Sequence, residues 1–382
     1  MLYSQMQPAF TIYRNLYNTP THFAVSLICS TLMPPPHTSS AAVIDAEGHL
    51  NSPRDSGMSF CENGVLEATT LEALRRHQGD KTRVLSIQSH VVSGYCGNKS
   101  AIFPLQLHGF DVDFVNSVQF SNHTAYEHIR GQRLTETELA ELYEGLKLNH
   151  IDHYSHVLTG YCGNPTFLRK IIDIVTDLKM KNPDLLFVCD PVLGDNGEYY
   201  TPKELMPIYR DEVIPLADVL TPNAFELQEI TGLKVENEAD CLEAIRALHR
   251  KGVKIVVVTS GMFDSPEKKI MHCYASLKQG EDAFTQHRFE IPVLQGRFVG
   301  TGDVFASLLI VWLHIYKNDI PKAVSNVISS IQSLLRRTIK HAYGDKSPEE
   351  FTPTAAQAEL QLIQSRVDLL APSISINYVK LP

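Results

Sequence analysis

The chain has 382 residues, of which 43% are hydrophobic, and its formal net charge is −9 at pH 7. This length allows one large α/β domain or two smaller ones, and the apolar content is sufficient for a sizeable core, as in a soluble globular protein. The acidic balance and the absence of long Lys/Arg clusters argue against nucleic acid or an anionic membrane as the main partner.

The cysteines and the apolar stretches point to a cellular compartment. Seven cysteines are scattered along the chain and never form a C-x-x-C pair, which indicates a reducing environment, so we expect a cytoplasmic protein. The nearest candidate for a membrane-spanning helix, residues 23–33, is too short and is interrupted by Ser26 and Ser30. Because Arg14 is the one basic residue before it, a disordered leader is favoured over a secretory or organelle-targeting segment.

Residues 1–80 show no sustained hydrophobic period. They include three consecutive prolines at 34–36 and shift to an acidic composition rich in Gly and Ser over 45–64. We interpret residues 1–80 as an N-terminal extension, with one short helix over 66–77, and place the folded domain at residues 81–382.

Strand-like and helix-like segments alternate from Arg83 onward. Strands are predicted over 84–88, 111–118, 154–159, 185–189, 218–220 and 254–259. Helices are predicted to end at 107 and to span 135–148, 166–180, 224–231 and 239–251. Thr135 and Glu138 form the sequence pattern of a capping box. The β-branched run over 255–258 is typical of a parallel strand buried on both faces.

The last third of the domain begins with an antiparallel strand pair, predicted at 270–277 and 283–291. Helices over 302–316, 321–342 and 353–365 follow, and 374–379 is a candidate edge strand. The whole pattern predicts an α/β fold with an open, mostly parallel β-sheet and helices on both faces. Such sheets bind ligands beyond the carboxyl ends of their strands. The residues that follow predicted strands, and should share that edge, are Ser89, Tyr161, Asp190, Thr221, Thr259 and Ser260.

The sequence Gly300-Thr301-Gly302-Asp303 leads directly into an apolar run that predicts a buried helix. Glycines allow backbone N–H groups to turn inward without a Cβ in the way, and the positive end of a helix suits a phosphate. Asp303 would then be a candidate general base. The motif alone fits an ordinary loop better, with Asp303 as a partner of the helix dipole.

Two acidic motifs also follow predicted strands. Residues 190–195 contain Asp190 and Asp195, which could hold Mg²⁺, although the same letters suit a simple turn. Thr221-Pro222-Asn223 precedes a further acid, Glu226. Glu226 could belong to the same acidic site, or it could be a plain helix-capping residue. Taken together with the glycine motif, these acids favour metal-assisted phosphoryl transfer. The sequence contains neither a Walker A motif nor the dinucleotide fingerprint G-x-G-x-x-G.

In order and spacing these motifs resemble those of the pyridoxal kinases, a family of the ribokinase-like superfamily. The resemblance runs from about residue 83 to the C-terminus, and its motifs are residues 86–90, 116–124, 189–195, 221–223 with Glu226, and 300–303. It implies a ribokinase-like fold, a homodimer, and ATP-dependent phosphorylation of the 5′-hydroxymethyl group of pyridoxal, pyridoxine and pyridoxamine in vitamin B6 salvage. The family usually begins at the first strand, so the resemblance leaves residues 1–80 unassigned.

The resemblance also implies roles for single residues. It makes Asp303 the base that takes the proton of the substrate hydroxyl, while the amides of Gly300, Thr301 and Gly302 bind the charge that develops on the γ-phosphate. The positions that match those around Mg²⁺ and an activating monovalent cation such as K⁺ are Asp190, Asp195, Thr221 and Glu226.

Contacts to both substrates are implied in the same way. Ser89 and Thr124 match polar contacts to the pyridine ring, beside the base Asp303. Val118, Phe120 and Tyr161 match the apolar and aromatic wall around the ring. The positions that match ATP contacts are Asp190, Asn223, Glu226, Thr259, Ser260, Gly300 and Thr301, with Tyr200 on a flexible cover over 197–200.

Two other functions remain possible from the sequence. A sister kinase of the same superfamily acts on hydroxymethylpyrimidine, but such enzymes typically carry Cys at the position of Asp303. A catalytically silent protein that binds vitamin B6 would have no need of a base at the anion-binding loop, so Asp303 disfavours it as well.

Overall fold

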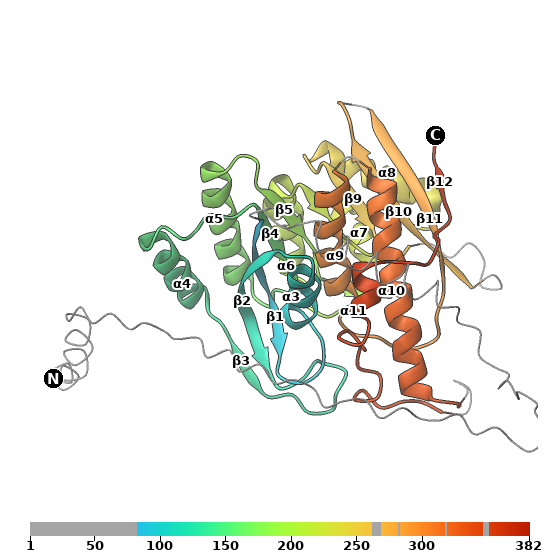
Figure 1. The fold of residues 1–382 in the computed structure, drawn as a ribbon. Coiled ribbons are helices and arrows are strands. Elements are labelled where there is room, and N and C mark those ends of the chain that lie inside the picture. Colours follow the sequence, from blue (N-terminus) through green and yellow to red (C-terminus); the bar gives the residue numbers. More distant parts are fainter. Residues whose placement is uncertain (1–81, 262–268, 282, 318, 347–350) are drawn as a thin grey trace, which may run out of the picture. The chain divides into compact units, whose positions relative to one another are not determined.

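The computed structural model describes residues 82–261, 269–281, 283–317, 319–346 and 351–382. The extension over 1–80 and its predicted helix lie outside the described residues. A single ten-stranded sheet organises the described part, in the order β12-β11-β10-β9-β8-β5-β4-β1-β2-β3. Helices cover both of its faces (Figure 1), which confirms the predicted α/β class.

The centre of the sheet is parallel. Six strands pair in parallel with their neighbours, namely β2 (Asp111–Phe120), β1 (Arg83–Val91), β4 (His156–Thr159), β5 (Leu186–Cys189), β8 (Val219–Leu220) and β9 (Ile255–Val258). The antiparallel strands at the two edges are β3 (Gly131–Arg133) on one side and β10 (Ile270–Lys278), β11 (Phe284–Pro292) and β12 (Tyr378–Lys380) on the other. The parallel centre therefore brings the carboxyl ends of six strands to one edge.

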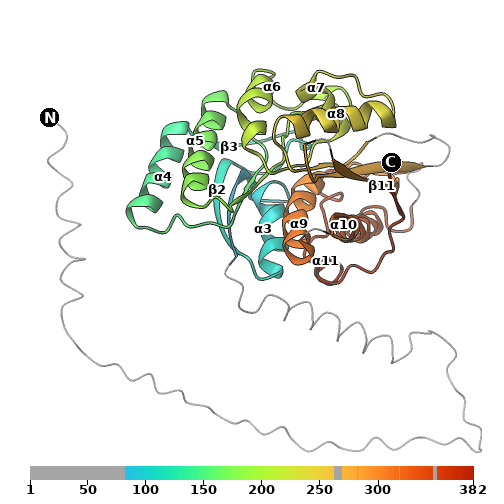
Figure 2. The same ribbon diagram turned by 90° about the horizontal axis from the view of Figure 1, so that it is seen from above.

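Two helical layers enclose this sheet (Figure 2). One layer contains α4 (Glu136–Leu148), α5 (Pro165–Lys181), α6 (Leu205–Ile208), α7 (Ala224–Thr231) and α8 (Glu238–Arg250). The other contains α3 (Asn98–Leu107), α9 (Thr301–Tyr316), α10 (Ile320–Tyr343) and α11 (Arg366–Leu370). In β9, Val256 and Val258 belong to the first core while Ile255 and Val257 belong to the second. This alternation explains why the whole of β9 is apolar.

Helix starts follow the local sequence. The Thr135 hydroxyl accepts a hydrogen bond from Glu138 N at 3.2 Å, and the Glu138 carboxylate accepts one from Thr135 N at 2.8 Å. The predicted capping box is thus confirmed. By contrast, α9 begins after Gly300 with no side chain capping its first N–H groups, which leaves them available to an anion.

The C-terminal segment departs from the prediction. The helix predicted over 353–365 is wrong, because these residues form turns and the short helix α11 comes after them. Leu360 and Leu362 are fully buried, and Gln361 N donates to the Thr338 hydroxyl of α10 at 3.1 Å. These tertiary contacts outweigh the weak helical preference of the sequence. The edge strand predicted over 374–379 is the shorter β12.

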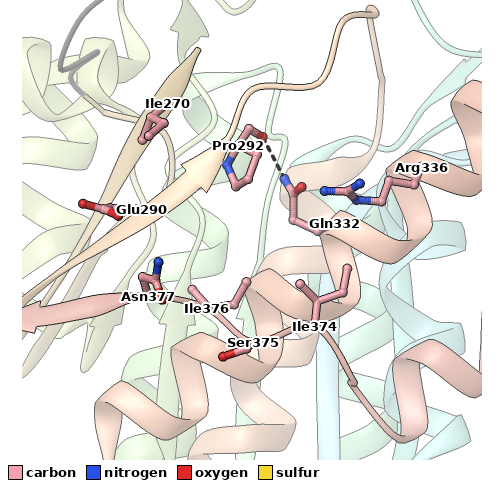
Figure 3. A pocket seen from close by; sticks show the side chains of 9 residues that line it. All are labelled: Ile270, Glu290, Pro292, Gln332, Arg336, Ile374, Ser375, Ile376 and Asn377. Carbon is pink, nitrogen blue, oxygen red and sulfur yellow. Dashed lines mark hydrogen bonds between the residues drawn. The ribbon is translucent and has the colours of Figure 1, made fainter. Parts of the chain in front are cut away.

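The same segment closes a small cavity against α10 and the end of β11 (Figure 3). Its volume is about 150 Å³, and the Gln332 amide donates to the Pro292 carbonyl at 3.2 Å beside it. The residues that line it are Ile270, Glu290, Pro292, Gln332, Arg336, Ile374, Ser375, Ile376 and Asn377. The residues predicted from the sequence to form the functional site are all absent from this lining. Among the described residues, the helices are too short or too polar to cross a membrane.

Candidate active site

The predicted site residues follow the parallel strands at one edge of the sheet. Ser89 lies near the end of β1, Tyr161 follows β4, and Asp190 follows β5 directly. Thr221 follows β8, and Thr259 with Ser260 follows β9. Because these strands are parallel neighbours, the topology places all of them at their shared carboxyl edge. The N-terminus of α9 reaches the same edge, as its contacts with two of these strand-end loops show.

Asp303 is held in the first turn of α9. Its Oδ2 accepts a hydrogen bond at 2.7 Å from the backbone N–H of Gly97, which is the N-cap residue of α3 and lies 206 residues earlier. The side chain is buried, and burial raises the pKa of Asp303 to about 6, against the lowering effect of the Gly97 N–H. A carboxylate in this state is still mostly ionised at neutral pH and is a stronger base than an exposed Asp.

Two close approaches require glycine at position 300, three residues before Asp303. Gly300 has φ +87°, and a Cβ there would lie 2.5 Å from the Tyr95 carbonyl oxygen and 2.7 Å from the Ser100 hydroxyl. A Cβ on Gly302 would lie 3.5 Å from Asp190 Oδ2, an ordinary contact. The uncapped start of α9 therefore lies directly against Asp190.

Asp190 is a buried acid whose nearest charged neighbours are also acids. The Thr221 hydroxyl donates to Asp190 Oδ1 at 3.1 Å. Burial raises the pKa of Asp190 well above its ordinary value, the charges of Glu226 and Asp303 raise it further, and the Thr221 hydrogen bond opposes the shift. This site therefore favours the arrival of positive charge.

Glu226 serves as a helix-capping residue and as part of this acidic group. Its carboxylate accepts hydrogen bonds from Leu193 N and Asn223 N, both at 2.9 Å, and the Asn223 side chain accepts one from Glu226 N to complete a capping box. Burial raises the pKa of Glu226 to about 7 although the backbone N–H groups lower it, and Asp195 adds to the rise. The simple capping interpretation is thus correct in geometry, but it does not account for a carboxylate buried among other acids.

The donor atoms at this edge suit hard cations. Carboxylate and hydroxyl oxygens are what Mg²⁺ prefers, and Mg²⁺ in nucleotide sites is usually held by one or two carboxylates, waters and substrate phosphates. Within the part of the chain that the structure describes, no three His, Cys, Asp or Glu side chains are arranged to hold a metal alone. The residues present therefore fit a cation that is coordinated partly by the protein and partly by a bound phosphate.

The predicted pyridine-binding residues lie on both sides of β1. The Ser89 hydroxyl is 3.8 Å from the Cys96 sulfur. It also lies so close to Gly97 that a Cβ on that glycine would be 2.4 Å from it. Val118 is buried in β2, and the carbonyl of Tyr161 accepts from the Ser117 hydroxyl at 3.0 Å.

Two further residues of the predicted pocket are more open. Phe120 is half-buried and lies under the Arg133 guanidinium, 5.1 Å from its ring centroid. Thr124 is exposed on the loop between β2 and β3. Of the predicted pyridine contacts, the structure brings Ser89 next to the Asp303 partner Gly97 and leaves Thr124 at the surface.

The predicted nucleotide contacts gather around the start of α7. Thr259 N donates to the Pro222 carbonyl at 3.0 Å, and the Ser260 carbonyl accepts from Ala224 N at 3.1 Å. The Asn223 amide donates to the Gly194 carbonyl at 2.7 Å. Thr259 and Ser260 therefore lie beside Asn223, as one nucleotide site would require.

The segment predicted to be a flexible cover forms a short hairpin. Its strands are β6 (Gly194–Asp195) and β7 (Glu198–Tyr199), and the turn between them contains Gly197 at φ +84°. Tyr200 follows β7 and has 59% of its surface exposed. The charges of Asp195 and Glu226 act on the Tyr200 hydroxyl and, after burial, raise its pKa.

Sequence reasoning missed three residues around Asp303. Gly97 supplies the N–H that binds the carboxylate, although its place in a turn before a helix was visible in the sequence. Cys96 next to it is half-buried, and burial of the thiol, followed by the charge of Asp303, raises its pKa to about 12, so this thiol stays protonated. Glu359 belongs to the segment predicted as a helix, and its sequence surroundings contain no signal for its contacts.

Comparisons with known proteins place this geometry in context. A sequence profile of the family described as phosphomethylpyrimidine kinase matches residues 165–348. The pyridoxal kinase of Ovis aries is 47% identical over 307 residues, which cover 78% of this chain and 98% of that protein.

Two solved structures are similar to this chain in both sequence and fold. The pyridoxal kinase from Leishmania donovani in complex with ADP and pyridoxine is 35% identical and superposes with a TM-score of 0.73 over 79% of this chain and 100% of that chain. The same protein in complex with ADP and pyridoxamine superposes with a TM-score of 0.72, again at 35% identity and over 79% of this chain and 100% of that chain.

Proposed function

The chain belongs to the pyridoxal kinases, which are ATP-dependent phosphotransferases of the ribokinase-like superfamily, and we propose that it phosphorylates the 5′-hydroxymethyl group of pyridoxal. Pyridoxine and pyridoxamine are proposed as further substrates, because complexes of a related kinase contain them. The observation that carries the proposal is the buried Asp303 carboxylate beside the uncapped N-terminus of α9.

We assign the proton transfer to Asp303. Its carboxylate takes the proton of the substrate hydroxyl while that oxygen forms a bond to the γ-phosphorus of ATP and the bond to the departing ADP breaks. The N–H groups of Gly300, Thr301 and Gly302 bind the charge on the transferred phosphoryl group. With a pKa of about 6, Asp303 is deprotonated at neutral pH and ready to act as a base.

We assign cation binding to the acids beside it. Asp190, Asp195, Thr221 and Glu226 would hold Mg²⁺ together with the phosphates of ATP, and a monovalent cation such as K⁺. The bound cations would supply the positive charge that neutralises the phosphates, because these motifs contain no Lys or Arg that could do so. The raised pKa of Asp190 and that of Glu226 support this assignment, because a nearby cation would offset both the burial and the repulsion between acids that raise them.

ATP and the vitamin would approach from the two sides of Asp303. Asn223, Thr259 and Ser260 are proposed to contact the nucleotide, with Tyr200 closing over it from the hairpin. Ser89, Thr124, Val118, Phe120 and Tyr161 are proposed to surround the pyridine ring. Closure of the hairpin would exclude water from the γ-phosphate and so suppress hydrolysis.

Phosphorylation of a hydroxymethylpyrimidine is the second candidate function, favoured by the profile match over residues 165–348. Asp303 disfavours it, because the sister kinases typically carry Cys there. The test is to compare pyridoxal, pyridoxine, pyridoxamine and hydroxymethylpyrimidine as acceptors with ATP, Mg²⁺ and K⁺. Higher kcat/KM for the three vitamers supports the proposal, whereas turnover of hydroxymethylpyrimidine alone would refute it.

We further propose that residues 81–382 form the catalytic unit, that the protein acts in the cytoplasm and that it is a homodimer. The cysteines of the described residues are free, which agrees with a reducing compartment. Light scattering in solution tests the dimer directly.

A further inference from the structure

The C-terminal segment reaches the candidate active site through one side chain, Glu359. Its Oε2 accepts a hydrogen bond from Tyr95 N at 3.0 Å, across 264 residues of sequence. Its Oε1 accepts from the Tyr126 hydroxyl at 2.8 Å and lies 3.0 Å from His123 Nε2. One carboxylate thus joins two loops that are far apart in the chain, the one after β1 and the one after β2.

The loop after β1 leads to the proposed base. Tyr95, which Glu359 binds, is two residues from Gly97, whose N–H binds the Asp303 carboxylate at 2.7 Å. The carbonyl of Tyr95 also lies where a side chain on Gly300 would be. A shift of Tyr95 would therefore move both the hydrogen bond on Asp303 and the wall of the anion-binding loop.

The loop after β2 leads to the proposed pyridine contacts. His123 directly precedes Thr124, and its ring lies 4.9 Å from the ring of Tyr126, centroid to centroid. Both rings approach Glu359. The carboxylate therefore also fixes the loop that carries Thr124.

The surroundings of Glu359 favour an ionised and immobile side chain. Its side chain is 14% exposed, and a Cβ on Gly94 would collide with its carboxylate. Burial alone would raise the pKa of Glu359, but hydrogen bonds from His123 and Tyr126, the charge of His123 and the Tyr95 N–H hold it below its ordinary value. A charged acceptor with several donors holds its geometry better than a neutral one.

We propose that Glu359 is a positioning residue for the phosphoryl acceptor: its carboxylate locks the loops of Tyr95 and of His123 together and so aligns the vitamin with Asp303. The inference rests on the proposed function. Glu359 contacts the loops on the vitamin side directly and approaches the anion-binding loop only through Tyr95, so its loss should weaken pyridoxal binding much more than ATP binding.

The test compares Glu359→Gln and Tyr126→Phe with Asp368→Asn in the full-length protein. Glutamine keeps the shape but offers one acceptor oxygen in place of two, and phenylalanine removes one donor while keeping the carboxylate. Asp368 is a matched control because it ties the same C-terminal segment to α10 through Arg337, at 2.7 Å, away from both loops. The readouts are KM for pyridoxal, KM for ATP, the dissociation constant of pyridoxal without ATP, and the pH profile of kcat/KM.

For Glu359→Gln we expect KM and the dissociation constant for pyridoxal to rise about tenfold, as for the loss of one charged hydrogen bond. KM for ATP should stay within about twofold, and the acidic limb of kcat/KM should move to higher pH as the Gly97 N–H loosens. Tyr126→Phe should show a smaller rise in KM for pyridoxal, and Asp368→Asn none.

Two results would count against the inference, and they are distinguishable. A parent protein that turns over pyridoxal, with unchanged pyridoxal KM and pH profile in Glu359→Gln and Tyr126→Phe, would overturn the positioning role alone. A parent protein that neither binds nor phosphorylates pyridoxal would contradict the proposed function and the inference with it.

Discussion

At the scale of single residues, the candidate site concentrates buried acids whose ionisation is unfavourable. Asp190, Glu226 and Asp303 all have a raised pKa, with burial as the main cause in each case. A folded protein that holds such groups ionised loses stability, and enzymes commonly accept this loss at the positions that bind charged ligands. A neutral variant of such an acid should therefore be more stable than the parent where it keeps the hydrogen bonds of the carboxylate.

Asp303→Asn tests this expectation. The folded pKa of about 6 lies above the ordinary Asp value of 3.8, so ionised Asp303 opposes folding above pH 6, and this cost fades as the pH falls toward 4. The difference corresponds to at most about 3 kcal/mol at pH 8. Asparagine can still accept the Gly97 hydrogen bond. We therefore expect Asp303→Asn to be more stable than the parent at pH 8, with a gain that shrinks toward pH 4, in urea denaturation at both pH values.

The pH dependence separates this cause from packing. A stability gain of equal size at pH 8 and pH 4 would show that the ionisation of Asp303 is not responsible, and would remove the physical basis for its raised pKa.

At the scale of elements, strand ends and helix starts form the site. The uncapped N-terminus of α9 contributes backbone N–H groups, and the position of this helix depends on Gly300 with its φ of +87°. Elsewhere, α10 ends at Gly344 with φ +59° and open space around it. The two glycines thus share a positive φ, but they differ in ψ, which is 3° at Gly300 and −122° at Gly344, and in their surroundings.

Gly300→Ala and Gly344→Ala make a matched pair. Alanine at 344 should cost about 1 kcal/mol through its strained backbone and leave kcat/KM unchanged. Alanine at 300 adds a clash with the Tyr95 carbonyl and displaces the start of α9, so we expect kcat/KM to fall by at least about 100-fold. Thermal melting and steady-state kinetics of both variants provide the check, and full activity in Gly300→Ala would contradict the close approach on which the loop depends.

Most helices and strands could be predicted from the sequence alone, but one segment and the order of the strands could not. Periodicity predicted the parallel strands and most helices because their apolar faces repeat, and Thr135 marked its helix through local chemistry alone. The helix prediction over 353–365 was wrong because the conformation of this segment depends on contacts of Leu360 and Leu362 with the rest of the fold. The order of strands could not come from local patterns either, since pairing between distant segments leaves no local signal.

The sequence Gly-Tyr-Cys-Gly-Asn occurs twice, at residues 94–98 and 160–164, and it illustrates the same limit. Asn164 is the N-cap residue of α5 and its side chain accepts from Thr166 N at 2.8 Å. Asn98 lies one position further into its helix α3, where its buried amide donates to Val115 O at 2.9 Å and to Asn116 Oδ1 at 2.8 Å. Identical letters thus perform different tasks, so coincidence is the better explanation of the repeat.

At the scale of the whole molecule, the family resemblance occupies part of the chain. The sheep enzyme is matched over 98% of its length by 78% of this chain, and the residues proposed for catalysis lie between Ser89 and Asp303. We predict that a protein truncated to residues 81–382 retains kcat/KM for pyridoxal within about twofold. A much larger loss, in a truncated protein that still unfolds cooperatively, would assign residues 1–80 a part in catalysis.

The central claim is that Asp303 is the base of a pyridoxal kinase reaction. The most direct measurement is the rate of pyridoxal 5′-phosphate formation from pyridoxal and ATP, with Mg²⁺ and K⁺, between pH 5 and pH 9 for the parent and Asp303→Asn.

The account predicts that kcat/KM of the parent falls below a pH of about 6, where Asp303 becomes protonated. Asp303→Asn should be folded, slower by about 10²- to 10⁴-fold, and without this acidic limb. An Asp303→Asn protein that keeps parental turnover, or the same acidic limb, would contradict the claim.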